Sequence, residues 1–219
     1  SSAASDVYKR QKALDTDLAR PKFAIMNPEI TYTLPDYQTQ CGCADIMMHT
    51  MERYFVLEDT MEITDKIAQD VMKNVMKYAK ILKKDPENYE ARAEIMWCGS
   101  LSHNGLTGCG TCGGDWATHL IEHELGGMFD VAHGAGLAAV WGSWARYVMD
   151  EKPERFAQFA VDVMGVEESD DVKSTALKGI EAVEEFYRMI EMPTNMKELG
   201  IDPTDEQIKD MAMKATNND

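Results

Sequence analysis

The period of the apolar residues is the feature that most restricts the fold of this chain. Along most of the sequence, apolar side chains recur at intervals of three and four, which is the spacing of one face of an α-helix. Proline, which interrupts helices, occurs only seven times, whereas methionine occurs sixteen times. We therefore predict a mainly α-helical fold with methionine side chains filling its core.

One stretch near the start departs from this period. Residues 22–35 mix β-branched and aromatic side chains around the turn signal Asn27-Pro28, so we expect one or two short extended segments there. Helix-capping residues divide the rest of the chain. The expected helices cover 38–55, the capping box Asp59-x-x-Glu62 to 82, Asp85-Pro86 to 101, 115–129, 133–149, 153–164, 170–192 and a short last segment opened by Thr204.

Composition and charge bound the number of domains and the class of partner. The chain has 219 residues, 44% of them hydrophobic, and a formal net charge of −16, which suits one globular domain that repels phosphate groups. No apolar run approaches the roughly eighteen residues of a membrane span, and the first residues do not form a secretory signal. We therefore expect a soluble, cytoplasmic protein that binds neither nucleic acid nor membrane. Five cysteines, an odd number, favour free thiols.

The five histidines are unevenly placed, and four of them fall in two groups. Asp45 and His49 lie four residues apart in an expected helix, so both side chains project from one face. His119 and His123 repeat this spacing, and His133 follows in the next expected helix. A carboxylate and an imidazole at such a spacing can share one cation. The two groups together predict a metal site.

A rival interpretation uses some of the same residues. His119-x-x-Glu122-His123 has the form of an inverted zinc protease motif, which leaves a metallohydrolase open as an alternative. His103 stands apart near a helix end, where we expect its imidazole to cap carbonyl groups.

Two further motifs lie in the glycine-rich segment 105–115. Glycines at 108, 110 and 113 spell a dinucleotide-binding fingerprint, but they follow an expected helix, whereas that motif needs a preceding strand. Cys109-x-x-Cys112 has no second cysteine pair, so it supports neither a zinc ribbon nor a redox site. We expect a plain loop.

The chain resembles the C-terminal half of the iron-containing, group III alcohol dehydrogenases, particularly the butanol dehydrogenase-like branch. The resemblance runs from about Arg20 to at least Gly200 and is carried by four segments, NPEITYTLP, ADIMMHTMERYF, AEIMWCGSLSHNGL and DWATHLIEHELGGMFDVAHGAGLAAV. It implies a helical metal-binding domain of the dehydroquinate synthase-like or iron alcohol dehydrogenase type, with a short extended N-terminal segment.

The resemblance also implies the roles of individual residues. In the family, one divalent metal is held by an Asp and a His four apart and by two further His fourteen apart, which here are Asp45, His49, His119 and His133. His123 then matches a non-ligand histidine near the substrate and the nicotinamide, a candidate for proton relay. Nitrogen and oxygen ligands permit Fe²⁺ or Zn²⁺.

Members of the family carry an additional α/β domain that binds NAD or NADP, and no such sequence is found here. We therefore expect 1–19 to be a leader and a remnant of a missing N-terminal domain, and 20–219 to be an all-helical metal-binding catalytic domain. The implied reaction interconverts a small alcohol and its aldehyde with NAD(P), in a homodimer when full length. Alone, this part is expected to have little or no activity, and a non-catalytic metal-binding module stays open as a further alternative.

Overall fold

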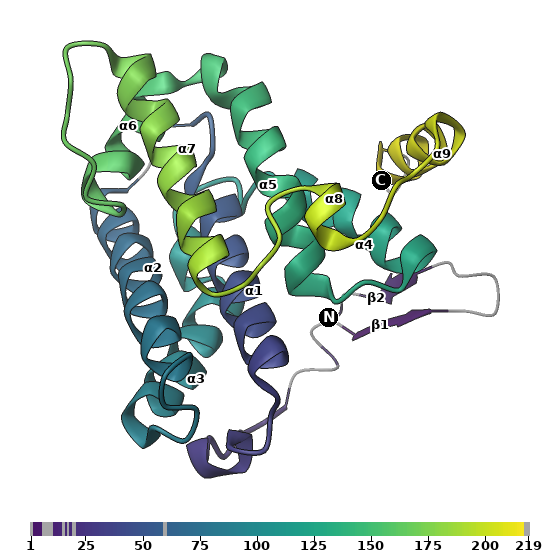
Figure 1. The fold of residues 1–219 in the computed structure, drawn as a ribbon. Helices are drawn as coiled ribbons and strands as arrows, with labels where there is room; N and C mark the ends of the chain where they lie inside the picture. The colour runs from purple at the N-terminus through teal and green to yellow at the C-terminus, as the bar shows by residue number, and fades with distance from the viewer. Residues whose placement is uncertain are drawn as a thin grey trace.

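The computed structural model describes residues 2–5, 11–14, 16, 18, 21–58 and 61–216. The described part consists of α-helices joined by loops, with one small β-hairpin near the N-terminus (Figure 1). The mainly helical fold is thus confirmed. Its helices are α1 (Asp36–Tyr54), α2 (Glu62–Leu82), α3 (Tyr89–His103), α4 (Ala117–Phe129), α5 (His133–Val148), α6 (Pro153–Asp162), α7 (Val172–Met189), α8 (Met196–Leu199) and α9 (Asp205–Thr216). Strands β1 (Ser2–Ser5) and β2 (Gln11–Leu14) pair antiparallel, and 3₁₀ turns cover Pro28–Thr31, Leu106–Gly108 and Met149–Glu151.

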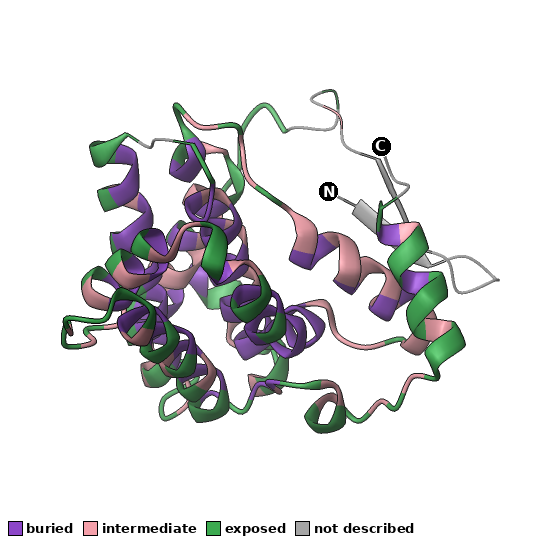
Figure 2. Cartoon of the chain, turned by 90° about the horizontal axis from the view of Figure 1, so that it is seen from above, coloured by how far each residue is buried: buried purple, intermediate pink, exposed green. Residues whose placement is uncertain are grey.

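Helix α1 is the central element of the fold. It packs against α2, α3 and α5, while α7 packs against both α5 and α6 (Figure 1). Buried residues gather on the inward faces of the helices and exposed residues on the outward faces (Figure 2). This arrangement follows from the three-and-four period of the apolar residues, because each helix buries one face.

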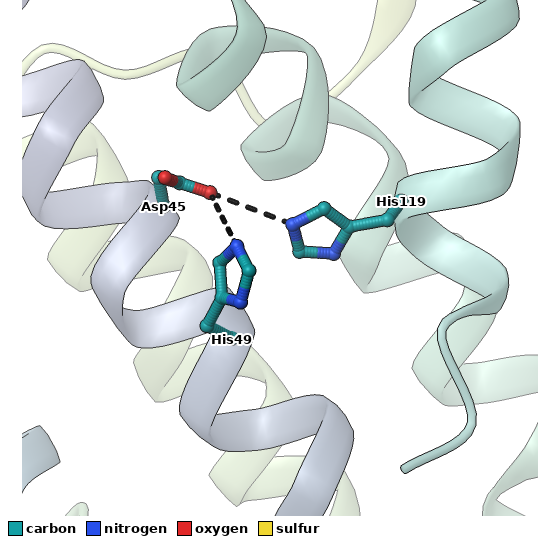
Figure 3. Close-up of side chains that lie close together, drawn as sticks. All are labelled: Asp45, His49 and His119. Atoms are coloured by element: carbon teal, nitrogen blue, oxygen red, sulfur yellow. Dashed lines mark ion pairs between the residues drawn. The ribbon is translucent and has the colours of Figure 1, made fainter. Parts of the chain in front are cut away.

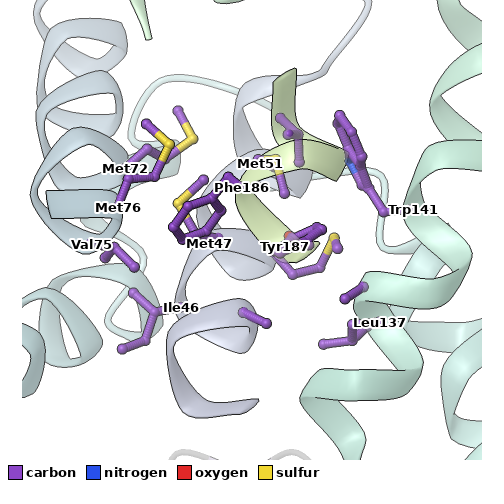
Figure 4. Close-up of a cluster of buried hydrophobic side chains, with 14 of the residues drawn as sticks. Ile46, Met47, Met51, Met72, Val75, Met76, Leu137, Trp141, Phe186 and Tyr187 are labelled. Atoms are coloured by element: carbon purple, nitrogen blue, oxygen red, sulfur yellow. The ribbon is translucent and has the colours of Figure 1, made fainter. Parts of the chain in front are cut away.

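Methionine fills much of the main core, as the sequence predicts. Met47, Met48, Met51 and Met72 are fully buried, and Met76 joins the same cluster (Figure 4). The flexible thioether side chain fits the irregular gaps between crossing helices. Large rings complete the cluster, among them Trp141 and Tyr187.

A second, smaller cluster holds α4 to its neighbours. Leu125 of α4, Val140 of α5 and Met211 of α9 form its buried part. Helix α4 packs against α5 and α9. The buried apolar side chain of Leu125 therefore belongs to this cluster and not to the core around α1.

An ion pair is buried where α2 meets α6. Both guanidinium nitrogens of Arg155 contact the carboxylate of Asp65, Nη1–Oδ2 at 2.5 Å and Nη2–Oδ1 at 2.7 Å. The Arg155 Nε–H donates to the carbonyl of Tyr54 at 2.9 Å, and the guanidinium lies 3.5 Å from the centre of the Tyr54 ring. The pair joins α6 to both α2 and the end of α1.

Several helix starts differ by about two residues from the sequence prediction, and two of them differ in how the helix is capped. Helix α2 begins at Glu62 rather than at a capping box with Asp59, which lies outside the described residues. The predicted start of the third helix at Asp85-Pro86 is wrong: residues 85–88 form a turn, and the Asn88 side chain caps α3 by accepting a hydrogen bond from a first-turn amide at 3.0 Å. Helices α6 and α7 end slightly earlier than predicted, and α8 was not predicted.

The stretch 22–35 forms no strand. Residues 28–31 form a 3₁₀ turn instead, because proline at the first helical position favours a helical turn. Asn27 caps this turn by accepting the Glu29 N–H at 3.1 Å. The extended N-terminal structure is instead the hairpin of β1 and β2. Among the described helices, none combines the length and the apolar character that crossing a bilayer would need.

Candidate metal centre

One face of α1 carries the first part of the site. Asp45, His49 and Glu52 follow one another at helical intervals of four and three, so their side chains leave α1 on the same side. His119 reaches this face from the first turn of α4, and His133 is the first residue of α5. Three helices thus bring together residues that lie up to 88 positions apart, since 133 − 45 = 88.

A single carboxylate oxygen is the meeting point of three imidazoles. Asp45 Oδ1 lies 3.6 Å from His49 Nε2, 3.5 Å from His119 Nε2 and 3.4 Å from His133 Nε2 (Figure 3 draws the first two contacts). Four ligand atoms placed tetrahedrally at about 2.1 Å from a metal ion are about 3.4 Å apart. The distances from Asp45 to the three imidazoles therefore suit a shared divalent cation, and the ligand atoms of Asp45, His49 and His119 all lie within 4.8 Å of one another.

Burial of unpartnered atoms supports the same fit. Asp45 Oδ1 and His119 Nε2 are both buried, and neither has a hydrogen-bond partner. Buried polar atoms are nearly always paired, so two that face each other without a partner suit coordination of a cation between them. The His133 side chain is 38% exposed, whereas that of His119 is 7% exposed, so the site opens to solvent beside His133.

The electrostatics of the site hold Asp45 as a carboxylate. Burial alone would raise its pKa, but contacts with His103, His119 and His133 outweigh burial and hold the pKa of Asp45 well below its usual range. Burial lowers the pKa of His49 to about 2, despite the opposing charge of Asp45. His49 is thus a neutral imidazole, the form that binds metal.

The pKa values of the two imidazoles from α4 and α5 are raised, whereas that of His49 is lowered. Burial lowers the pKa of His133, but Asp45 and Glu122 outweigh it and raise that pKa to about 10. His119 is likewise raised, because Asp45 and Glu52 outweigh its burial. Without a cation, these carboxylates draw protons to His119 and His133, and a bound cation would replace that positive charge.

His123, the predicted proton-relay residue, lies at the edge of this group. Its ring stacks on His133, with centroids 5.5 Å apart and an interplanar angle of 29°, and its centroid is 6.1 Å from that of His119. Burial lowers its pKa to about 4, with the neighbouring charges of His133 and His119 adding to the effect. His123 is therefore a neutral imidazole beside the opening of the site.

His103 takes a position that its place in the sequence did not reveal. As predicted, it caps a carbonyl: Nδ1 lies 2.9 Å from the Gly99 oxygen. Its Nε2, however, lies 3.4 Å from Asp45 Oδ2, and its ring centroid is 3.8 Å from that of His49. Spacing within α3 carries no signal of this contact, because both neighbours belong to α1.

The inverted protease motif has a specific geometry here. Glu122 is 1% exposed, and its Oε2 contacts His133 Nδ1 directly. Ligand atoms of Glu122, His123 and His133 lie close enough to one another to hold a cation as a second arrangement. Since Glu122 is engaged by His133, that arrangement would require this contact to break.

The glycine-rich segment is a loop, as predicted, and it shapes the wall of the site. It turns through left-handed residues at Gly110, Gly113 and Gly114 and leads into Trp116, itself left-handed at φ 63°. The Trp116 ring then packs edge-on against His49 and its centroid lies 5.3 Å from that of His119. The helix expected over 115–129 begins at Ala117, and Asp115 Oδ1 accepts the Ala117 N–H at 2.9 Å just before it.

Comparison with known proteins gives the family of this chain. Residues 39–219 match the C-terminal region of the Fe-containing alcohol dehydrogenase family. The chain is 35% identical over 203 residues to NADH-dependent butanol dehydrogenase A of Clostridium acetobutylicum. The matched residues make up 92% of this chain and 51% of that protein. It is 33% identical over 193 residues to NADPH-dependent aldehyde reductase YqhD of Escherichia coli, covering 88% of this chain and 49% of the relative.

A solved structure agrees with these relatives. The crystal structure of NADH-dependent butanol dehydrogenase A from Thermotoga maritima superposes with a TM-score of 0.90 at 33% identity, over 98% of this chain and 53% of that one. The chain thus spans about half the length of the relatives it matches. With the family match covering most of its length, this chain belongs to the Fe-containing alcohol dehydrogenase family and corresponds to the family's C-terminal region.

Proposed function

We propose that this chain is the metal-binding part of a metal-dependent alcohol dehydrogenase, and that Asp45, His49, His119 and His133 are its metal ligands. One observation carries the proposal: Asp45 Oδ1, buried and without a hydrogen-bond partner, lies 3.4–3.6 Å from the Nε2 atoms of the three imidazoles. Three neutral imidazoles and one carboxylate suit Fe²⁺ or Zn²⁺.

The reaction we propose interconverts a small alcohol and its aldehyde. A divalent ion bound at this site would act as a Lewis acid that polarises the substrate oxygen. Access for that oxygen lies beside His133, the most exposed of the four proposed ligands. His123 stacks there as a neutral imidazole, so it can take up the proton of an alcohol or return it to a reduced aldehyde.

The cofactor and the assembly are also part of the proposal. The relatives are named as NADH- or NADPH-dependent enzymes, and we propose NAD or NADP as the hydride acceptor here. The glycine-rich loop follows α3 and not a strand, so it lacks the framework of a dinucleotide site. We therefore expect the 219 residues alone to show little dehydrogenase activity, and the full-length enzyme to be a homodimer.

Metal content of the purified chain tests the ligand set. The chain and its Asp45→Ala, His133→Ala and His123→Ala variants are prepared anaerobically with Fe²⁺ or Zn²⁺ and analysed by elemental analysis, with circular dichroism confirming the helical fold of each. We expect about one ion per chain in the parent and in His123→Ala, and loss of the ion in the other two. Full occupancy in Asp45→Ala would contradict the proposed ligand set.

The alternative sites give a different pattern. The metallohydrolase alternative uses the His119-x-x-Glu122-His123 motif, and it is favoured only by the closeness of the ligand atoms of Glu122 and His123 to each other and to His133. It would keep its ion in Asp45→Ala and lose it in His123→Ala. A non-catalytic module would bind metal as proposed yet fail to oxidise alcohols when a separately produced nucleotide-binding domain of a relative is added.

A further inference from the structure

Two buried carboxylates lie behind the imidazoles that come from α4 and α5. Glu52 of α1 contacts His119 Nδ1, and Glu122 of α4 contacts His133 Nδ1. Both carboxylates are only 1% exposed. A polar side chain so deeply buried is unfavourable unless its oxygens are paired, so these contacts need an explanation.

Glu52 uses both carboxylate oxygens on the same residue. Its Oε2 contacts the His119 ring, and its Oε1 accepts the backbone N–H of His119 at 3.1 Å. That amide lies in the first turn of α4, where N–H groups have no partner within the helix. Glu52 therefore fixes both the start of α4 and the orientation of the imidazole it carries.

Glu122 repeats this arrangement one helix further along. It follows His119 by one helical turn on α4, and its Oε2 contacts Nδ1 of His133 on α5. The space it occupies is kept free by Gly136, where a Cβ would lie 2.7 Å from Glu122 Cγ and 2.8 Å from Oε1. The packing of α5 on α4 is thus shaped around this carboxylate.

The contacts determine which ring nitrogen faces the cation. An imidazole can give its Nε2 lone pair to a cation only when its proton is on Nδ1, and a carboxylate accepts that proton's hydrogen bond. In both His119 and His133 the Nδ1 atom faces the glutamate, while Nε2 faces Asp45 Oδ1 at 3.5 and 3.4 Å.

We propose that Glu52 and Glu122 are positioning residues that hold the rings of His119 and His133 in the metal-binding tautomer. This inference rests on the ligand set of the proposed function. His49 shows why only two of the imidazoles need such support. It shares α1 with Asp45, its Nδ1 has no partner, and its ring is held between Trp116 and His103. Only the ligands that cross from other helices have a carboxylate behind them.

Carboxylate-to-amide substitutions test this role. Glu52→Gln and Glu122→Gln keep the size of the side chain but replace one of its two carboxylate oxygens by an NH₂ group, which donates and cannot accept a hydrogen bond. Zn²⁺ affinity is measured by competition with a chelator, and the visible absorption of bound Co²⁺ reports the geometry of the ligands. We expect each variant to bind Zn²⁺ roughly 10- to 100-fold more weakly than the parent chain and to change the Co²⁺ spectrum.

Glu184→Gln is the matched control. Glu184 of α7 is a mostly buried carboxylate whose partners are Arg146, at 2.5 and 3.0 Å, and Arg188, at 3.7 Å, so its loss should not alter Zn²⁺ affinity or the Co²⁺ spectrum. If Glu52→Gln fails to fold because α4 loses its cap, Glu122→Gln decides the question, since its carboxylate is hydrogen-bonded to His133 and caps no helix among the described residues.

The possible failures can be told apart. Parent-like Zn²⁺ affinity and an unchanged Co²⁺ spectrum in both glutamine variants, with loss of metal in Asp45→Ala, would overturn the positioning role and leave the ligand set intact. Absence of Zn²⁺ binding in the parent chain would overturn the ligand set and, with it, this inference.

Discussion

Gly134, in the first turn of α5, lies directly against the backbone of Cys41 on α1: a Cβ at Gly134 would stand 2.0 Å from the Cys41 carbonyl oxygen. Neither backbone can yield to such a contact by a change of rotamer. Cys41 precedes Asp45 by one helical turn, and His133 precedes Gly134 directly. This close approach of two helices therefore brings His133 next to Asp45, where the two side chains lie 3.4 Å apart.

Gly134→Ala is expected to force α5 away from α1. Overpacking of this kind costs about 1–3 kcal/mol of folding free energy, and the shift should abolish Zn²⁺ binding even in molecules that stay folded. Chemical denaturation and chelator competition measure the two effects. Gly42→Ala is the control: it lies exposed within α1 with no atom near its Cβ position, so alanine should stabilise the helix by about 0.5–1 kcal/mol. Unchanged Zn²⁺ affinity in Gly134→Ala would refute the dependence of the site on this contact.

Asp65→Ala is expected to destabilise the fold strongly without acting on the site. It would leave the buried guanidinium of Arg155 without its carboxylate, which costs about 3–5 kcal/mol of unfolding free energy. Asp70→Ala, on the same helix, removes a carboxylate that is 75% exposed and paired with Lys73, and should change stability by less than about 1 kcal/mol. Urea denaturation of the metal-free proteins compares them. Equal losses in the two variants would show that the buried pair contributes no more than the exposed one.

The five cysteines are expected to differ in reactivity. Cys109 and Cys112 are exposed in the glycine-rich loop, whereas Cys41, Cys43 and Cys98 are buried. Burial, helped by Glu94, raises the pKa of Cys98 to about 11, so at pH 8 only about one thousandth of it is the reactive thiolate. A thiol reagent at pH 8 should label two cysteines quickly in the native protein and all five after denaturation.

The pH dependence of labelling follows from the direction of that shift. Because the pKa of Cys98 is raised, its thiolate fraction grows about tenfold per pH unit up to about pH 11. Labelling of Cys98 should therefore increase with pH wherever the fold persists. Mutation of Cys109 and Cys112 to serine should remove the fast labelling at pH 8. A third cysteine that reacts as fast as the loop pair would contradict the burial of this group.

Sequence patterns predicted those parts of the fold that depend on neighbours along the chain. Thr204 opens α9 as expected. It forms a capping box with Gln207: the Thr204 N–H donates to Gln207 Oε1 at 2.9 Å, and the Gln207 N–H donates to Thr204 Oγ1 at 3.3 Å. The start of α3 was missed because two local signals competed. Asp85-Pro86 begins a turn, and Asn88, three residues later, supplies the cap.

In the candidate site too, sequence patterns predicted the contacts within one helix and missed the contacts between helices. The pairing of Asp45 with His49 can be read from helical spacing, and Glu52 continues that face, so its presence there could have been predicted. The contacts of Glu52 with His119 and of Glu122 with His133 depend on how α4 and α5 pack, which no spacing within one helix encodes. Family resemblance, and not periodicity, linked the histidines of α4 and α5 to Asp45.

The separate small core of α4 has a consequence for local unfolding. Leu125 ties α4 to α5 and α9, whereas Asp45 is on α1, so a cation shared by Asp45 and His119 would add a direct link between α4 and α1. When the free ion concentration is a hundred times the dissociation constant, binding stabilises the folded, metal-binding form by about 2.7 kcal/mol. Amide hydrogen exchange in α4 should then slow about a hundredfold, with little change in α2, which carries no proposed ligand. Metal loading should therefore be measurable from the exchange rates of α4 amides even where no reaction is assayed.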